Sequence, residues 1–546
     1  MFNLASGFIM IFGGAIALFG AHPKIAKDLE GVDPASNVDV IVQYTQAPAA
    51  AHHRKVLSRG GKHKFTLEVI QAGAYSMPAA QLLDLANDPE VARISLDHPV
   101  HGSLDISRPT VGADIAFTNG WTGKGIGVAV LDSGIAASAR FNDATRSSRI
   151  VYNETFLTKA GTTDQYGHGT HVAGIVGARA KIQSDPYQGV APGVNLINLK
   201  VLDETGAGTD SAVIAALQRA IALKTTYNIR IVNLSLGRPV AGSYKTDPLC
   251  QAVEQAWKAG IVVVTAAGNE GRNNTAGTGG YGTVSAPGND PYVITVGAMK
   301  SMATASRGDD LIASYSSKGP SLIDHVAKPD LVAPGNRVVS TKGGAAENSL
   351  ATMYPQNVVA TTDLRLSGTS MATAFVSGAA ALLLEKTPAL TPDQVKARLM
   401  KTASKNFPTM SVATDPVTGV AYTSQYDMFT IGAGYLDVWA ALNNNDVAAA
   451  GKTAMSPLAS YNSTDGKVYL VNDASALWGS SALWGSSALW GSTVFVSGSS
   501  ALWGSSALWG SSATQGFSAL WGSSALWGSS ATPGSESVSL LINGEN

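Results

Sequence analysis

Between about residue 108 and residue 445, short apolar runs alternate with longer segments in which apolar residues recur at helical spacing. The short runs are rich in β-branched residues, and such near-continuous runs are typical of central strands in a parallel sheet covered on both faces. Four of these predicted strands are 127–131, 195–201, 230–235 and 261–265. The pattern therefore predicts an α/β fold with a doubly wound, mainly parallel sheet and helices on both faces.

The predicted helices between these strands include 210–224 and 248–258. A further helix is predicted after Thr391, because a capping residue, a proline at the first helical position and a reciprocal Gln394 follow one another. Cys250 is the chain's one cysteine, so no intramolecular disulfide can form. We expect it to be a small buried residue near the start of its helix.

Residues 22–101 show a different pattern, with predicted strands at 38–44, 65–70 and 91–97 and a short helix at 78–86. The basic segment 47–64 reads as a solvated loop; its histidines (His52, His53 and His63) leave a metal site as the alternative. This region predicts a small α+β domain at 22–106, ahead of a large domain at 107–445.

Residues 2–21 form an apolar run that is broken only by Asn3, Ser6 and glycines. About 20 apolar residues can span a bilayer, so 1–21 is a signal peptide or an uncleaved membrane anchor. No lysine or arginine precedes the run, and no clean Ala-x-Ala site ends it. We favour bacterial-type export, which would make the protein secreted or part of the cell envelope.

The last region, 446–546, repeats Ala-Leu-Trp-Gly-Ser seven times, starting at 476, 482, 488, 501, 507, 519 and 525. The even spacing of six would place the tryptophans of one run on one face of an extended strand. Such a face could pack on the large domain, on a surface or on another copy of the chain. The alternative is a low-complexity tail without a fixed fold.

Composition narrows the class of partner. Charged residues make up 14% of the 546 residues, and the net charge is −1. We therefore expect no nucleic-acid partner and no attraction to an anionic membrane surface.

Three segments each place one reactive side chain beside glycine: Leu-Asp132-Ser-Gly, Gly-His168-Gly-Thr-His and Gly-Thr-Ser370-Met-Ala. A serine hydroxyl becomes a nucleophile when an imidazole removes its proton, and the imidazole needs a carboxylate to fix its tautomer. A fourth segment, Ala-Gly-Asn269-Glu-Gly, offers an amide that could bind an oxyanion. Taken singly, Asp132 could be a turn or capping residue and Ser370 a helix cap.

The four segments together are similar to those of subtilisin-like serine proteases (family S8), over roughly 108–440. The resemblance implies that Asp132 orients His168, that His168 is the general base, that Ser370 is the nucleophile and that Asn269 binds the oxyanion. It implies a serine endopeptidase that cleaves protein or peptide substrates. A zinc site built on His168 and His171 is the rival interpretation, but no Glu-x-x pattern accompanies them, and we expect His171 to be buried and bonded to backbone.

The resemblance also points to the walls of the substrate pocket, which are Ser235, Leu236, Gly237, Ala267, Gly268 and Ser285. Ser285 stands where the family commonly has glycine, which would make the pocket shallower and more polar. No metal or other cofactor is required for this chemistry. Structural calcium is common in the family; the loop 179–188 offers Gln183 and Asp185, without a dense cluster of oxygen ligands, so no ligands are assigned.

Residues 22–106 resemble the I9-type inhibitor propeptide of these proteases, so the chain's own propeptide is expected as an inhibitor that the enzyme removes between about 98 and 110. An ordinary accessory domain is the alternative. From another functional class, the rival is a binding or scaffold protein in which the tryptophan repeats do the work and the protease fold is inactive. All four catalytic residue types are present, which argues against an inactive fold.

Overall fold

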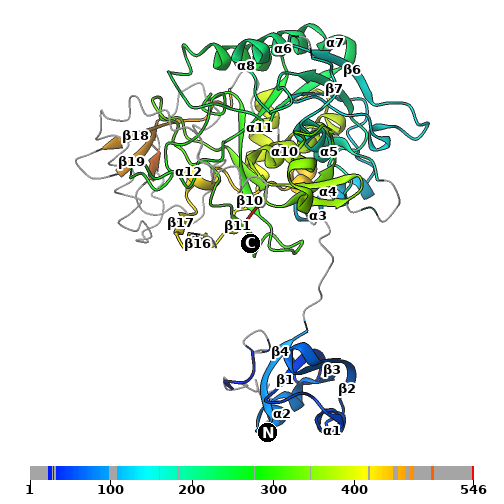
Figure 1. Ribbon diagram of the computed structural model, residues 1–546. Coiled ribbons are helices and arrows are strands. Elements are labelled where there is room, and N and C mark those ends of the chain that lie inside the picture. The colour runs from blue at the N-terminus through cyan, green and yellow to red at the C-terminus, as the bar shows by residue number, and fades with distance from the viewer. Residues whose placement is uncertain are drawn as a thin grey trace, which may run out of the picture. The chain divides into compact units, whose positions relative to one another are not determined.

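The computed structural model describes residues 22–26, 29, 32–97, 107–158, 160–180, 185, 187–275, 277–344, 346–415, 418–446, 453–462, 467–471, 494–496 and 544–545. The chain divides into two compact units, the small unit (Met1–Gly102) and the large unit (Ser103–Asn546) (Figure 1). The predicted export segment at 1–21 and the seven Ala-Leu-Trp-Gly-Ser repeats lie outside the described residues.

The small unit is a four-stranded antiparallel sheet in the order β2-β3-β1-β4, with two short helices. Its elements are β1 (Asn37–Tyr44), α1 (Ala50–Leu57), β2 (Lys62–Leu67), β3 (Ala72–Pro78), α2 (Leu82–Ala86), β4 (Val91–Leu96) and the 3-10 turns Glu68–Ile70 and Ala79–Gln81. Val40, Val42, Tyr75, Met77 and Ile94 are fully buried and form the centre of its core. Alternate residues of β1 are buried, as the polar–apolar alternation predicts.

The prediction of a loop at 47–64 is wrong. Helix α1 occupies residues 50–57 and β2 begins at Lys62. The helix buries His52 and Val56, which are four residues apart and share one face. Basic residues surround this narrow buried stripe, so the helical spacing of the buried residues could not be recognised in the sequence. Strand β3 was not predicted, because Ala72, Gly73 and Ala74 are poor strand formers whose place is fixed by pairing with β1 and β2.

The large unit contains an eight-stranded sheet in the order β11-β10-β9-β8-β5-β7-β6, with β12 also paired to β10. These strands are β5 (Gly127–Asp132), β6 (Ile150–Thr155), β7 (Asn195–Lys200), β8 (Ile229–Leu234), β9 (Val262–Ala266), β10 (Ile294–Lys300), β11 (Leu311–Ile312) and β12 (Leu331–Pro334). All pairs are parallel except β10 with β11, so the sheet is mixed. The predicted α/β class is confirmed, and the four predicted strands are β5, β7, β8 and β9.

The long helices form two packed sets. Helix α6 (Asp210–Ala222) packs on α8 (Pro248–Lys258), while α10 (Thr369–Lys386) packs on α5 (His168–Gly177) and on the sheet. Figure 1 shows α6 and α8 near the top of the view, with α5 and α10 below them. Fifteen of the 18 residues of α10 are buried, so this helix runs through the core rather than along the surface. Helix α11 (Pro392–Thr402) begins with the predicted capping box between Thr391 and Gln394.

Shorter elements complete the large unit. They are α3 (Ser107–Thr110), α4 (Ala113–Thr118), α7 (Lys224–Tyr227), α9 (Leu350–Met353), α12 (Met428–Ile431), α13 (Val438–Asn443), β13 (Val338–Thr341), β14 (Val358–Ala360), β15 (Asp363–Leu366), β16 (Met410–Thr414), β17 (Ala421–Gln425), β18 (Leu458–Asn462), β19 (Lys467–Val471), β20 (Val494–Val496) and the 3-10 turns Ala139–Phe141 and Pro355–Asn357.

Segment 453–462 is tied to the large unit by a buried polar cluster. The Ser456 hydroxyl donates to Asp330 Oδ1 at 2.6 Å, and Lys396 Nζ donates to Ser456 Oγ at 2.9 Å. Lys328 Nζ lies 2.8 Å from Asp330 Oδ2, and Asp330 and both lysines are fully buried. Burial lowers the pKa of Lys396 to about 7. Segment 453–462 is therefore in direct contact with the sheet domain.

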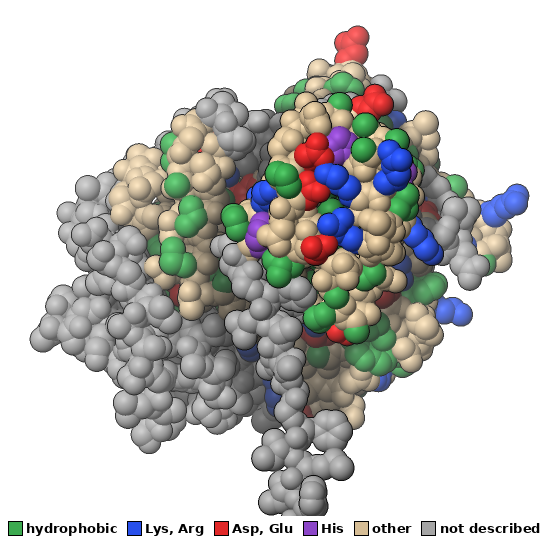
Figure 2. Space-filling view, turned by 90° about the horizontal axis from the view of Figure 1, so that it is seen from below, with side chains coloured by type: hydrophobic (Ala, Val, Ile, Leu, Met, Phe, Trp, Pro, Cys, Tyr) green, Lys and Arg blue, Asp and Glu red, His purple; other side chains and the backbone are tan. Residues whose placement is uncertain are grey.

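Two surface findings complete the description. Within the residues described, no helix combines the length and the apolar character needed to cross a bilayer. On the face drawn in Figure 2, basic and acidic side chains lie interspersed, in keeping with a net charge of −1.

Candidate active site

Strand β5 lies where the order of the sheet reverses. The two strands that come next in the sequence, β6 and β7, lie on one side of β5, with β7 adjacent to it. The later strands β8, β9 and β10 lie on the other side. In open α/β sheets, ligands bind beyond the carboxyl ends of the strands at such a point. Asp132 is the last residue of β5 and is fully buried. Its carboxylate therefore lies where a ligand cleft is expected.

Asp132 and His168 are in direct contact. His168 Nδ1 lies 2.7 Å from Asp132 Oδ1, which also accepts the backbone N–H of Ser133 at 2.8 Å. The His168 side chain keeps 18% of its surface exposed, so a substrate can reach the ring from outside. Burial alone would lower the pKa of His168, but the charge of Asp132 and its hydrogen bond outweigh burial and raise that pKa above the ordinary value.

A buried carboxylate that was not predicted from the sequence, Asp164, joins the segment after Asp132 to the segment around His168. Asp164 Oδ1 accepts the Ser133 hydroxyl at 2.9 Å and the Gly167 N–H at 2.7 Å. Asp164 Oδ2 accepts both the backbone N–H and the hydroxyl of Thr170, at 2.8 and 2.6 Å. Asp164 thus holds the residue after Asp132 and both flanks of His168. The available signal was an aspartate four residues before the histidine.

Ser370 is the second residue of α10, whose N-cap is Gly368 with φ of 145°. Glycine suits this conformation, which lets the chain turn sharply into the helix. The Ser370 hydroxyl donates to the carbonyl oxygen of Ser235 at 3.0 Å, and the Ser235 hydroxyl donates to the carbonyl of Ser370 at 2.8 Å. This reciprocal pair ties the N-terminus of α10 to the end of β8. In this arrangement the hydroxyl of Ser370 is directed at Ser235.

The Asn269 side chain is oriented by the turn that precedes Ser370. Asn269 Oδ1 accepts the backbone N–H of Thr369 at 2.9 Å and its hydroxyl at 3.1 Å. The Thr369 hydroxyl also accepts the N–H of Gly268 at 3.2 Å. Because the amide oxygen is engaged by Thr369, the amide nitrogen points away and is available as a donor.

The structure brings the predicted pocket residues together. Ser285 N donates to the carbonyl of Ala267 at 2.9 Å. A Cβ on Gly268 would lie 2.5 Å from Ser285 Oγ, and one on Gly237 would lie 3.0 Å from Ser285 Cβ. Ser285 therefore packs directly against both glycines. Gly237 is exposed and Leu236 is half-buried, so the wall formed with Ser235 opens to solvent.

His171 is buried and bonded to backbone, as predicted. Its Nε2 lies 3.1 Å from the carbonyl of Val338 and 3.0 Å from that of Leu364. Burial, and then the nearby His168, lower the pKa of His171 to about 3. The ring is a neutral core group that joins α5 to β13 and β15.

Structural calcium stays a prediction, and the carboxylate of the loop considered for it is engaged by protein groups. Asp185 Oδ2 pairs with Arg140 Nη1 at 3.0 Å, and Asp185 Oδ1 accepts the N–H of Tyr187 at 3.0 Å. Gln183 lies outside the described residues. No group of three or more His, Cys, Asp or Glu in the described part of the chain is arranged to hold a metal ion. Cys250 is buried as predicted, and burial raises the pKa of its thiol.

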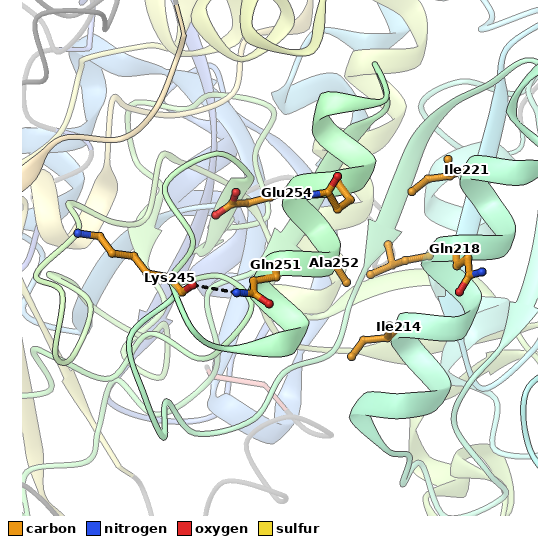
Figure 3. A pocket seen from close by; sticks show the side chains of 9 residues that line it. Ile214, Gln218, Ile221, Lys245, Gln251, Ala252 and Glu254 are labelled. Atoms are coloured by element: carbon orange, nitrogen blue, oxygen red, sulfur yellow. Dashed lines mark hydrogen bonds between the residues drawn. The ribbon is translucent and has the colours of Figure 1, made fainter.

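A separate groove of about 550 Å³ lies between α6 and α8 (Figure 3). Ile214, Leu217, Ile221 and Ala252 supply its apolar lining, and the polar lining is Gln218, Lys245, Gln251, Glu254 and Gln255. None of the predicted site residues lines it. The groove is thus a surface feature apart from the Asp132–His168 pair.

An acid–base pair at a strand end, together with a serine at a helix N-terminus and an oriented amide, has the make-up of a serine hydrolase that forms an acyl-enzyme. The relatives that the chain matches are serine proteases, which identifies the kind of hydrolase. The chain is a serine-type endopeptidase. A model of the subtilase family (peptidase S8) matches residues 123–434, and the chain belongs to that family.

Three relatives illustrate the similarity. The serine protease AprX of Bacillus subtilis (strain 168) is 36% identical over 340 residues, which cover 60% of this chain and 73% of the relative. Subtilisin E of the same organism is 34% identical over 366 residues, covering 66% and 83%. The extracellular serine proteinase of Thermus sp. (strain Rt41A) is 34% identical over 346 residues, covering 61% and 71%.

Proposed function

We propose that Asp132, His168 and Ser370 form the catalytic triad of this endopeptidase. His168 takes the proton from the Ser370 hydroxyl as the oxygen attacks the scissile carbonyl, and then gives that proton to the leaving amine. Water hydrolyses the resulting acyl-enzyme by the same route in reverse order. Asp132 keeps the proton of the imidazole on Nδ1 and stabilises the charged ring.

The observation that carries this proposal is the 2.7 Å contact between His168 Nδ1 and the buried Asp132 carboxylate. It fixes the tautomer that leaves Nε2 to accept a proton. The Ser370 hydroxyl has to turn from the Ser235 carbonyl toward that nitrogen. In this proposal the Ser370 side chain rotates about its Cα–Cβ bond when substrate binds, because catalytic hydrogen bonds commonly form only in the complex with substrate.

Asn269 and the backbone N–H of Ser370 are proposed as the two donors to the oxyanion. Thr369 holds the amide oxygen of Asn269, so its NH₂ group is pre-oriented before charge develops. Such donors act because no reorganisation is needed during the reaction. Ser285 against Gly237 and Gly268 makes a shallow, partly polar pocket, and we propose that small or medium apolar side chains occupy it.

A fluorophosphonate probe tests the assignment of Ser370. We expect the probe to modify Ser370 alone, as found by peptide mass mapping, and the Ser370→Ala chain to remain unlabelled. Ser321→Ala is the matched control, because Ser321 is a buried serine placed elsewhere, and it should label as the natural chain does. Labelling of another residue would refute the triad.

The proposal extends to a precursor that is exported and cleaves itself. Its support is that the small unit is a separate compact body with its own core, and that one relative is named an extracellular proteinase. In this proposal residues 22–106 form the inhibitor propeptide, 107–445 the protease domain and 446–546 a tail that mediates surface or self-association. Expression of the Ser370→Ala chain should leave the uncleaved precursor, seen by intact mass; normal cleavage in that variant would assign processing to another protease.

A further inference from the structure

Gly544 and Glu545, at the far end of the tail, lie in a polar pocket of the large unit. Glu545 Oε1 accepts the Ser314 backbone N–H at 2.9 Å and Arg272 Nη2 at 3.0 Å, and it also accepts the Ser314 hydroxyl. The backbone of Glu545 pairs with the Asn336 side chain in both directions, at 2.8 and 3.0 Å. Glu545 is 6% exposed, so the pocket encloses it almost completely.

Other residues hold the base of this pocket in place. Arg272 Nε donates to the Ser314 hydroxyl at 2.6 Å, and Arg272 Nη1 pairs with Asp415 at 2.8 Å. The guanidinium also lies over the Tyr422 ring, 4.5 Å from its centre. The arginine is therefore fixed by three neighbours besides Glu545. An oriented guanidinium beside a backbone N–H is a receptor for a carboxylate.

The pocket admits a glycine before the acidic residue. Gly544 has φ of 69°, and a Cβ there would lie 2.4 Å from Arg337 Cγ and 2.6 Å from Ser367 Oγ. Both the conformation and the space exclude larger side chains. The pocket thus requires three features of its occupant: a turn of the backbone, a glycine, and a carboxylate on the next residue.

The position of this pocket links it to catalysis. Arg272 follows Asn269 by three residues, and Ser367 precedes Ser370 by three. Three residues of chain span at most about 11 Å, so Gly544, packed on Ser367, lies close to the serine. The contacts of Gly544 and Glu545 are distinct from the walls at Ser235–Gly237, Gly268 and Ser285. Those walls are assigned to the side chain before the scissile bond, and we assign this separate pocket to the residues after it.

We propose that the pocket formed by Arg272, Ser314 and Asn336 is a binding subsite for an acidic side chain on the leaving side of a peptide substrate, and that Glu545 occupies it in the same chain. This inference rests on the proposed function, since it needs the serine to be the reaction centre. A tethered occupant removes a fraction of the enzyme from substrate binding and leaves the chemistry unaltered. The apparent substrate affinity falls by that fraction, so KM rises while kcat stays constant.

Full-length Glu545→Lys tests the proposal, because a lysine is repelled by Arg272. Full-length Glu536→Lys, which makes the same charge change elsewhere in the tail, is the matched control. The substrates are quenched fluorescent peptides that carry either glutamate or glutamine at each of the first four positions after the scissile bond. We expect Glu545→Lys to lower KM roughly tenfold for the best glutamate peptide, as for a subsite about nine-tenths occupied in the natural chain, with kcat unchanged.

In the Glu545→Lys enzyme, the glutamate peptide should also bind better than its glutamine partner. Equal KM values for Glu545→Lys and Glu536→Lys, or equal KM values for the two peptides, would overturn the inference. Hydrogen exchange supplies a second readout, because the Ser314 amide that donates to Glu545 should exchange faster in Glu545→Lys.

The triad and the subsite are tested by different measurements. Fluorophosphonate labelling of Ser370 in the same preparations reports on the proposed function. If Ser370 is labelled and KM does not move, the subsite is refuted and the triad stands. If the label falls elsewhere, the triad is refuted whatever KM does.

Discussion

Two carboxylates of the large unit and two of the small unit lie in opposite surroundings. In the large unit, Asp132 and Asp164 are at most 1% exposed. Asp132 takes part in two hydrogen bonds through Oδ1, and Asp164 accepts four through its two oxygens. In the small unit, the side chains of Asp84 and Glu90 are 65% and 39% exposed and pair with Arg59 and with Lys55 on the surface. Buried carboxylates are costly to desolvate and need hydrogen bonds in compensation, whereas exposed ion pairs contribute little to stability. Asp132 and Asp164 thus fix the geometry of the candidate site, whereas Asp84 and Glu90 lie on the surface around an apolar core.

The largest expected effect of removing a buried carboxylate is at Asp132. Asp132→Asn keeps the shape but removes the charge that selects the productive tautomer of His168, so kcat should fall about 10⁴-fold, as in other triads. Asp132 also raises the pKa of His168. Activity needs the neutral ring and therefore rises with pH through that pKa, so the acidic limb of the pH–rate profile should move to lower pH in the variant.

Stopped assays of kcat/KM across pH measure both effects, with the exposed Asp309→Asn as control. An acidic limb that stays in place would show that Asp132 does not control the protonation of His168. An unchanged kcat would remove the distinction between buried and exposed carboxylates on which the comparison of the two units rests.

The next effect in size is at Asn269, which is a neutral member of the buried network. Asn269→Ala removes one oxyanion donor and should lower kcat about 10²–10³-fold, the loss known for the equivalent donor of subtilisin, with little change in KM. Single-turnover measurement of acylation checks this, and the exposed Asn119→Ala serves as control. A large rise in KM with normal kcat would make Asn269 a substrate-binding residue instead.

The four site segments could be found from sequence because each places its reactive residue beside glycine and next to an apolar run, which precedes Asp132 and Asn269 and follows His168 and Ser370. The long helices were also predictable, since α8 and the capping box at Thr391 carry their own local signals. Local pattern failed where tertiary contacts decide. Asp164 lies in no apolar run, and its role comes from Ser133 and Thr170, which only the fold brings to it.

The same reasoning explains the remaining misses. Strand β3 is held by its two neighbours rather than by the propensity of its alanines and glycine. The pocket around Glu545 joins residues that are up to 273 positions apart, and no pattern along the chain reports such a meeting.

Replacing the buried Asp164 is expected to lower the stability of the large unit. In Asp164→Asn, an NH₂ group faces donors that the carboxylate oxygen accepted, which leaves buried N–H and O–H groups unsatisfied at about 1–3 kcal/mol each. We expect the free energy of unfolding of the large unit to fall by about 3 kcal/mol. Chemical denaturation in the Ser370→Ala background, which prevents self-digestion, measures it. A loss below about 1 kcal/mol would place this buried carboxylate with the surface pairs.

The smallest effect is expected at the matched position in the small unit. Asp84 accepts Arg59 Nε at 2.7 Å on the surface, and exposed pairs of this kind contribute about 0–1 kcal/mol because water and salt screen them. Asp84→Asn in the same Ser370→Ala background should therefore change the stability of the small unit by less than about 1 kcal/mol. The difference from the unsubstituted protein should shrink further at high salt, because salt screens the charges of solvent-exposed pairs. If Asp84→Asn instead costs as much as Asp164→Asn, burial is not what separates the two units, and the stability of the small unit depends on its surface charges rather than on the apolar core around Val40 and Tyr75.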